Sequence, residues 1–195
     1  FFYSSGGNIN EFTLSEPYDI STLSFNQSAN LGGTNTTLAL ALNDDGTKLY
    51  TNDADNLEEY TLNTAYDVST ASLNTEYTFD EAIGVPSEIV FKPDGSQMIV
   101  QARNSGEVYS YTLSTPYDLS TASFDVSGSF TMADPTGLAV SPDGTKLFSS
   151  QDQFEGTSEG EVRSFDFGTA WNVTTLSEDA VVGFGDTYVN AIAFD

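Results

Sequence analysis

The stretch that decides the fold is Tyr109-Ser-Tyr-Thr-Leu-Ser-Thr-Pro-Tyr-Asp-Leu-Ser-Thr121. Closely related versions occupy residues 10–22 and 58–70, and a more divergent one, with Trp171 in place of Tyr117, occupies residues 163–175. This aromatic residue recurs at intervals of about 50 residues, and self-similarity at such a period is typical of propellers and solenoids. The sequence therefore indicates a repeat architecture, and it indicates the fold more strongly than the function.

Each repeat contains four segments with the pattern of short strands. The first is small and apolar, as in residues 137–140, and near-continuous apolar residues bounded by turns are typical of a strand buried on both faces. An Asp-Gly dipeptide follows, as in Ser141-Pro-Asp-Gly144. It predicts a turn because it supplies the positive φ of a tight hairpin. Three further strands complete the repeat: the second is expected at residues 48–51, 97–100 and 146–149, and the last is more polar. Four antiparallel strands graded from apolar to polar predict a propeller blade that runs from axis to rim.

We therefore predict an all-β fold, a β-propeller of four-stranded antiparallel blades. The predicted repeats are 36–84, 85–133, 134–186, and 187–195 joined with 1–35, all within one domain of residues 1–195. A shared blade of N- and C-terminal strands would close a four-bladed ring without an open edge. The alternative is part of a larger or two-chain propeller. Because Phe1-Phe-Tyr3 resembles the interior of a strand, we expect a mature or excised part of a longer protein.

The charge balance restricts the partners of this chain. It has 29 Asp and Glu against 5 Lys and Arg, a net charge of -24, which repels nucleic-acid phosphates and anionic lipid surfaces. No apolar run approaches the ~20 residues that span a bilayer. We thus expect no nucleic-acid partner and no direct membrane insertion. Such acidity suits saline surroundings or the binding of divalent cations.

The turn residues resemble those of a known group of repeats. Ser141-Pro-Asp-Gly-Thr-Lys-Leu-Phe148 resembles the Pro-Asp-Gly signature of TolB-like and YVTN-type propeller repeats, and residues 92–95 are similar. The phrase at residues 111–124 resembles a repeat in large surface proteins of marine bacteria and their phages. The resemblance covers all four repeats, although Asn43-Asp-Asp-Gly46 lacks the proline. It implies a propeller at an extracellular, cell-surface or virion-surface location, and it implies little about activity because such propellers bind varied partners.

Two motifs have a structural and a functional interpretation. The Tyr-Asp-hydrophobic-Ser-Thr phrase predicts a turn in which Asp19, Asp67 and Asp118 cap the backbone, and a ligand pocket used four times is the alternative. Residues 156–160 match a nucleophile elbow, but that elbow needs a base and a strand-to-helix turn. The chain has no His and no Cys, which removes the Ser-His-Asp and Cys-His routes and the usual zinc ligands. We therefore predict no enzymatic activity.

Charge placement predicts a binding face. Lys48, Lys92 and Lys146 flank the Asp-Gly turns, so most of the cations should lie on one side of the blades. The opposite side gathers the loops between strands two and three and between successive blades, and variable loops on a rigid scaffold commonly carry function. The residues that we predict on this binding face are Asp53, Asp55, Asp80, Glu81, Arg103, Asp134, Asp152, Glu155, Asp186 and Tyr188.

Calcium is the metal that the carboxylates of these loops suggest most directly. Asp53-Ala-Asp55 begins like a calcium loop, and hard cations take several oxygen ligands. Leu57 and Glu58 depart from the EF-hand pattern. We therefore expect no required cofactor, with Ca²⁺ at Asp53 and Asp55 as one interpretation and a solvated acidic face as the other.

These observations lead to three functional hypotheses. The first is a non-catalytic extracellular binding or assembly module of a larger cell-surface or virion protein, with a protein or glycan on a surface as its partner. The second is a glycan-binding lectin, assisted by calcium. The third is a carboxylate-dependent glycosidase or lyase, which requires two carboxyl groups roughly 5 to 10 Å apart. Self-association is left open.

Overall fold

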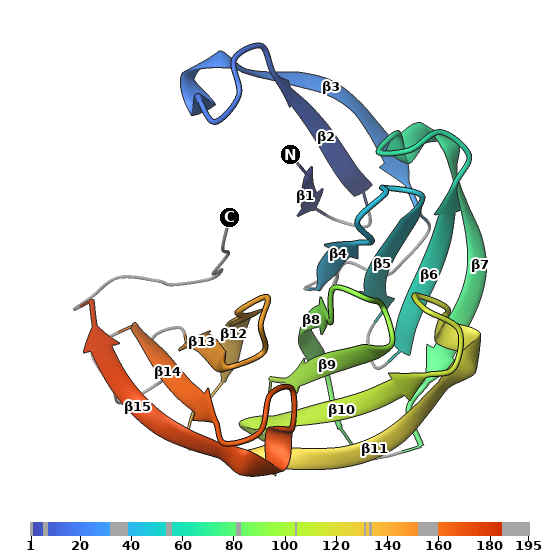
Figure 1. Cartoon of the computed structure of the whole chain (residues 1–195). Coiled ribbons are helices and arrows are strands. Elements are labelled where there is room, and N and C mark those ends of the chain that lie inside the picture. Colours follow the sequence, from blue (N-terminus) through green and yellow to red (C-terminus); the bar gives the residue numbers. More distant parts are fainter. Residues whose placement is uncertain are drawn as a thin grey trace. The chain divides into compact units, whose positions relative to one another are not determined.

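The computed structural model in Figure 1 describes residues 2–5, 8–31, 39–53, 56–80, 83–103, 105–130, 132, 134–151 and 160–184, with the backbone alone for residues 2–5 and 53. Within these ranges the regular structure is β, apart from four single-turn 3-10 helices. The predicted all-β class is therefore confirmed. None of the described helices is long and apolar enough to cross a membrane.

The chain forms two compact units, Phe1–Thr78 and Phe79–Asp195, and each contains two antiparallel sheets whose strands follow in chain order. In the first unit, one sheet consists of β1 (Phe2–Ser5), β2 (Asn8–Leu14) and β3 (Leu23–Asn30). The other consists of β4 (Leu40–Leu42), β5 (Lys48–Asp53), β6 (Asn56–Leu62) and β7 (Ala71–Thr78). In the second unit, one sheet consists of β8 (Pro86–Phe91), β9 (Gln97–Ala102), β10 (Glu107–Leu113) and β11 (Ala122–Ser129). The other consists of β12 (Pro135–Val140), β13 (Lys146–Gln151), β14 (Glu161–Phe167) and β15 (Leu176–Gly183).

This topology is the one predicted for propeller blades. Antiparallel neighbours in sequence order form a meander, which is how a blade is built. The set of four such sheets is consistent with a four-bladed propeller-like arrangement. The first sheet has three strands among the described residues, and the fourth strand that we predicted for it, at residues 187–195, lies outside them. Ring closure and the single-domain boundaries therefore stay predictions.

The last two strands of every sheet share a β-bulge at the same place. The pairing shifts after Glu11 in β2, Glu59 in β6, Ser110 in β10 and Ser164 in β14. One residue of the outer strand is left unpaired at each bulge, and a bulge re-aims side chains and bends the strand. These unpaired residues are Asn26, Asn74, Asp125 and Asp179.

Apolar side chains fill the space between the two sheets of each unit. In the first unit Ile9 of β2 packs with Leu49, Tyr60, Leu62 and Val68. The larger cluster of the second unit joins both of its sheets through Ile99, Val108, Phe130, Met132, Leu138, Val140, Leu147, Phe165, Phe167, Trp171 and Val173. Burial of these side chains is the main stabilising contribution to each unit.

The repeated phrase forms a turn followed by a 3-10 helix. These helices are η1 (Ile20–Thr22), η2 (Val68–Thr70), η3 (Leu119–Thr121) and η4 (Val173–Thr175). In the repeat of residues 85–133 the Asp118 carboxylate accepts hydrogen bonds from the Ser120 backbone N–H at 3.0 Å and from its hydroxyl at 2.6 Å. Asp19 and Asp67 act in the same way. The capping role that the sequence predicts is thus confirmed.

In the second, third and fourth sheets the aromatic residue of the phrase lies over the Asp-Gly turn of its own sheet. Tyr117 has a φ of 60°, donates its N–H to the Gly95 carbonyl at 3.0 Å and its hydroxyl to the Pro93 carbonyl at 2.8 Å. A Cβ on Gly95 would lie 2.3 Å from the Tyr117 ring, so only glycine fits this turn. Trp171 covers Gly144 in the same way.

Candidate functional site

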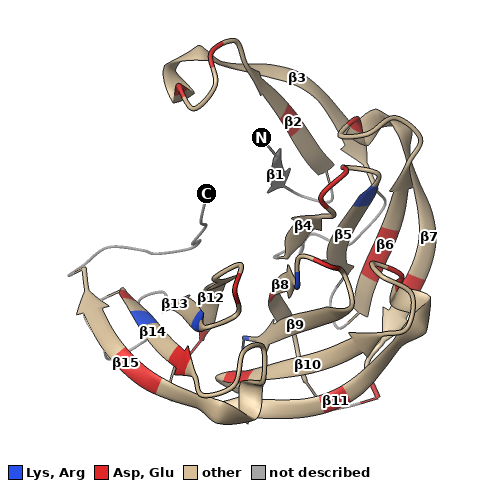
Figure 2. Cartoon of the chain, viewed as in Figure 1, with Lys and Arg blue, Asp and Glu red and all other residues tan. Residues whose placement is uncertain are grey.

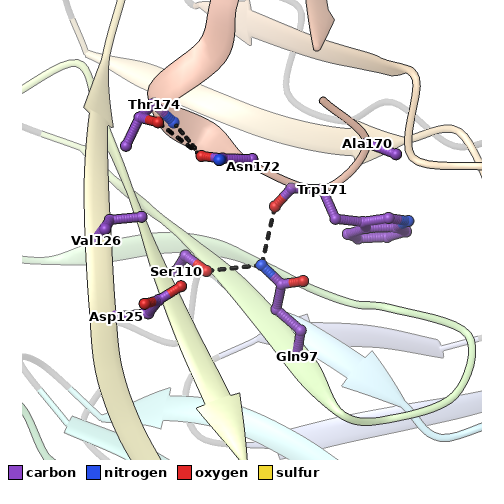
Figure 3. Close-up of a pocket in the computed structure, with 8 residues that line it drawn as sticks. All are labelled: Gln97, Ser110, Asp125, Val126, Ala170, Trp171, Asn172 and Thr174. Carbon is purple, nitrogen blue, oxygen red and sulfur yellow. Dashed lines mark hydrogen bonds between the residues drawn. The ribbon is translucent and has the colours of Figure 1, made fainter. Parts of the chain in front are cut away.

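A hollow of about 330 Å³ opens in the second unit, where the turn before η4 lies over β9, β10 and β11 (Figure 3). It follows from the fold, because the bulge in the β10–β11 pair turns one residue of β11 toward the neighbouring turn. The residues that line it are Gln97, Ser110, Asp125, Val126, Ala170, Trp171, Asn172 and Thr174.

Gln97 ties the wall of this hollow together. Its side-chain amide donates to the Ser110 Oγ at 2.7 Å and to the Trp171 carbonyl oxygen at 2.9 Å. Both amide hydrogens are therefore in use, and the Ser110 hydroxyl, which accepts one of them, keeps its own proton to donate. On the opposite wall Asn172 Oδ1 accepts from the backbone N–H and the hydroxyl of Thr174, at 3.1 and 2.7 Å. The Trp171 indole points away from Asp125 (Figure 3).

The equivalent position in the β12–β15 sheet carries a lysine. Gln97 is the first residue of β9, as Lys146 is of β13. There the Lys146 Nζ lies 3.0 Å from the Asp179 carboxylate, and the Ser164 Oγ lies 3.2 Å from it. Hydrogen bonds from Lys146 and Ser164 lower the pKa of Asp179 below its ordinary value, so the carboxylate is held ionised.

Asp125 is the counterpart of Asp179 and lacks such a lysine. In the part of the chain that the structure describes, the Asp125 carboxylate forms no ion pair. The bulge of the β4–β7 sheet also carries a lysine, since Lys48 lies 2.7 Å from Glu59. Asp125 thus offers a carboxylate to a ligand where the bulges of two other sheets pair a carboxylate with a lysine.

Every cation of the chain is already paired with a carboxylate. Figure 2 shows the few basic residues near acidic ones. The closest pairs are Lys48 with Glu59, Lys92 with Asp94, Arg103 with Asp134, Lys146 with Asp166, and Arg163 with Glu161, all between 2.6 and 2.9 Å. These pairs and the net charge of -24 disfavour a phosphorylated ligand.

The structure brings together two residues of the predicted binding face. Arg103 donates to Asp134 through Nε at 2.7 Å and through a second nitrogen at 3.5 Å, so its guanidinium is engaged within the chain. Asp80 is exposed, and Asp53 ends β5 with its side chain not described. The other predicted members lie outside the described residues: Asp55, Glu81, Asp152, Glu155, Asp186 and Tyr188.

The metal and carboxylate-pair hypotheses gain no support from the described residues. Across these ranges no group of three or more Asp, Glu, His or Cys side chains is placed to hold a metal ion. Calcium at Asp53 and Asp55 stays a prediction because their side chains are not described. The hollow is lined by one carboxylate, Asp125, rather than the pair that a glycosidase needs.

Sequence reasoning missed Gln97, Ser110 and Asp125. A signal existed, because alignment of the repeats places Gln97 where two other repeats have Lys48 and Lys146. That difference removes a positive charge from the β8–β11 sheet relative to the β4–β7 and β12–β15 sheets. Its meaning depends on the bulge, which brings the three side chains together.

No protein-family model and no curated protein sequence matches the chain. Solved structures do match. A "putative 6-phosphogluconolactonase" from Bacteroides uniformis has a TM-score of 0.60 and 16% identity, over 94% of this chain and 57% of that one. A second, from Bacteroides fragilis, has a TM-score of 0.58 and 16% identity, over 92% of this chain and 52% of that one. The fold is of the β-propeller type.

A third match comes from the structure of a nidogen/laminin complex, with a TM-score of 0.65 and 12% identity over 100% of this chain and 65% of that one. The chain thus spans between half and two thirds of the length of these matched chains. At this identity the likeness shows the fold alone. The assignment to TolB-like or YVTN-like repeats is not confirmed by it.

These matches correct our functional expectation. We expected a non-catalytic extracellular binding or assembly module, with a lectin or glycosidase as alternatives. Two chains with this fold carry the name "putative 6-phosphogluconolactonase", so the fold does not mark a non-catalytic extracellular module, and this finding overturns the expectation. The expectation failed because the fold itself was taken as a sign of a binding platform, although one fold supports unrelated functions. The surface location stays a prediction.

Proposed function

We propose that the chain is part of a propeller enzyme that acts on a small molecule without a phosphate group, with a lactone as its substrate class. The observation that carries this proposal is the Asp125 carboxylate, which has no ion-pair partner among the described residues and lies in a hollow beside the buried Ser110. The names of the matched propellers support the reaction class. Their low identity leaves the substrate to be decided by the residues of this chain.

The hollow offers the groups that lactone opening uses. Water adds to the carbonyl carbon, the ring C–O bond breaks, and the proton that the water loses ends on the ring oxygen, which gives a hydroxy acid. Ser110 is fully buried in this structure, so a substrate must displace the groups that cover it before the hydroxyl can donate a hydrogen bond to the carbonyl oxygen, where negative charge develops. Loss of such a donor typically costs about 10²- to 10³-fold in rate. Asp125 orients the substrate by accepting hydrogen bonds from its polar groups.

A substrate without phosphate follows from the charges. A phosphoryl group needs cations or free backbone donors, and the five cations of this chain already pair with carboxylates. The Asp125 carboxylate would repel a phosphate in the hollow. The substrate class therefore differs from the phosphorylated lactone in the names of the matched proteins.

A pH-stat assay of lactone opening tests this proposal. We expect α-hydroxy-γ-butyrolactone to open faster than its spontaneous rate, and 6-phosphogluconolactone to gain nothing. Asp125→Asn and Ser110→Ala should each lower kcat/KM by at least about tenfold, whereas Ser164→Ala, at the equivalent position of the last sheet, should leave it unchanged. A wild-type rate equal to the spontaneous one, a preference for the phosphorylated lactone, or full activity of Asp125→Asn would contradict the proposal.

The Pro-Asp-Gly turns bear on the finer classification of the repeats. Residues 92–95 and 141–144 form tight turns covered by Tyr117 and Trp171. This shared turn supports our proposal that the blades are of the TolB-like or YVTN-like type.

A further inference from the structure

The last sheet holds an ammonium group at its bulge. The Lys146 Nζ contacts Asp179 at 3.0 Å and Asp166 at 2.6 Å, and the Ser164 Oγ also contacts Asp179. These residues come from three adjacent strands, β13, β14 and β15. The arrangement shows which chemical group this bulge accepts: a primary ammonium, held by Asp166 and by Asp179, the carboxylate that the serine also contacts.

The β8–β11 sheet repeats part of this arrangement, without the ammonium and without the second carboxylate, because Thr112 lies opposite Gln97 where Asp166 lies opposite Lys146. Ser110 and Asp125 occupy the places of Ser164 and Asp179, because both pairs lie at the same register shift. Gln97 replaces the lysine, and its amide turns to Ser110 and to the Trp171 carbonyl rather than to Asp125. The carboxylate is left to line the hollow.

We propose that the hollow binds the primary ammonium group of a small ligand, with Asp125 as its counter-ion. The ligand ammonium takes the place that the Lys146 Nζ takes in the last sheet. If the ligand is the substrate, this inference rests on the proposed function, and the substrate is then a lactone that carries an amine. Binding of an amine can be measured without turnover.

The hollow provides room for more than the ammonium. Its volume of about 330 Å³ lies at the lower end of the range for small-molecule sites. Val126 and the turn residue Ala170 give the ligand an apolar wall, while Asn172 and Thr174 satisfy each other. A short carbon chain next to the ammonium suits these surroundings.

The expected affinity is modest. Asp125 is exposed, and an exposed ion pair is weak because water and salt screen it. A simple amine should bind with a Kd in about the millimolar range, and raising the ionic strength should weaken it. A ligand that also fills the apolar wall should bind more tightly.

Titration of isotopically labelled protein with butylamine, followed by NMR, tests the ammonium site. Butan-1-ol is the neutral control of the same size. We expect butylamine to shift the backbone signals of Asp125, Val126 and Thr174, and butan-1-ol to leave them in place. Equal shifts with both compounds, or shifts elsewhere in the molecule, would refute the proposal, as would equally strong binding of Ca²⁺ at these residues.

Three variants make the test specific. Asp125→Asn should weaken butylamine binding at least tenfold, and the matched variant Asp179→Asn should not change it. Gln97→Lys supplies the chain's own ammonium and should also abolish binding. Its folding is checked from its own NMR spectrum, and Asp125→Asn decides the matter if Gln97→Lys does not fold. Unchanged binding by Asp125→Asn overturns the ammonium site.

The lactone assay separates this inference from the proposed function. The comparison is between α-amino-γ-butyrolactone and α-hydroxy-γ-butyrolactone at a pH where the amine is protonated. At least tenfold higher kcat/KM for the amine supports both ideas. Turnover without this preference sinks the ammonium site and leaves the enzyme, whereas butylamine binding without any turnover sinks the enzyme and leaves the site.

Discussion

Replacing Gly95 with alanine should destabilise the second unit strongly. Gly95 has a φ of 69°, and a Cβ there would lie 2.3 Å from the Tyr117 Cδ2 and 2.4 Å from its Cε2. Both ring atoms are far inside any real contact distance, so the ring must move away. The turn and the aromatic residue that covers it would separate.

The magnitude follows from the contacts that the ring loses. The left-handed backbone costs alanine about 1 kcal/mol. The Tyr117 hydroxyl loses its hydrogen bond to Pro93 at 2.8 Å, a contribution of about 1 kcal/mol. Its ring contact with Phe91, at a centroid distance of 5.5 Å, contributes about another 1 kcal/mol. We expect Gly95→Ala to lower the free energy of unfolding by about 3 kcal/mol.

Urea denaturation followed by fluorescence measures this loss, which should lower the midpoint by about 1 M or more at an unchanged slope. Gly168→Ala is the control, because a Cβ there meets its nearest neighbour, the Thr175 Cβ, at 3.4 Å. In a Tyr117→Ala background the ring is absent, so Gly95→Ala should cost only about 1 kcal/mol. Equal effects of the two glycine variants, or no reduction in the Tyr117→Ala background, would refute the reasoning.

Two further predictions concern the same turns. Hydrogen bonds from Ser96, reinforced by Lys92, lower the pKa of Asp94 to about 2, so its contribution to stability is complete above the unfolded value near 4 and disappears as the pH falls toward 2. Asp94→Asn should therefore lose less stability than the wild type between pH 5 and pH 2, and a parallel fall of both urea midpoints would disprove this. Tyr18 is 89% exposed, so Tyr18→Ala should change the free energy of unfolding by less than about 0.5 kcal/mol. Tyr117→Ala should instead cost at least about 2 kcal/mol. Equal shifts of the thermal midpoint would contradict this prediction, because they would show that the two rings have the same role.

The blades could be predicted from the sequence because their signals are local. An Asp-Gly pair sets its own turn, and the phrase that ends at Thr121 contains both the aromatic residue and the Asp that caps η3. Because the unit recurs, each strand and turn could be assigned from the local signals of its own repeat. The expected strands therefore agree with β5, β9 and β13 to within two residues at either end.

The candidate site could not be predicted in this way, because its members meet only after the strands pair. Gln97, Asp125 and Asn172 are far apart in sequence, and the β10–β11 bulge decides which side chain of β11 faces the next turn. The binding face proposed from charge alone contained Arg103 and Asp134, which instead neutralise each other at 2.7 Å.

By itself, then, the sequence determined a chain of antiparallel β-blades, since turn chemistry and strand periodicity act over a few residues. Tertiary structure alone decided that the Asp125 carboxylate has no lysine beside it. The pairing of three strands places Lys146 next to Asp179, whereas Gln97, in the equivalent place, donates hydrogen bonds to Ser110 and Trp171. The physical reason is that the interactions of a charge depend on distances in space, which neighbouring residues in a sequence do not fix.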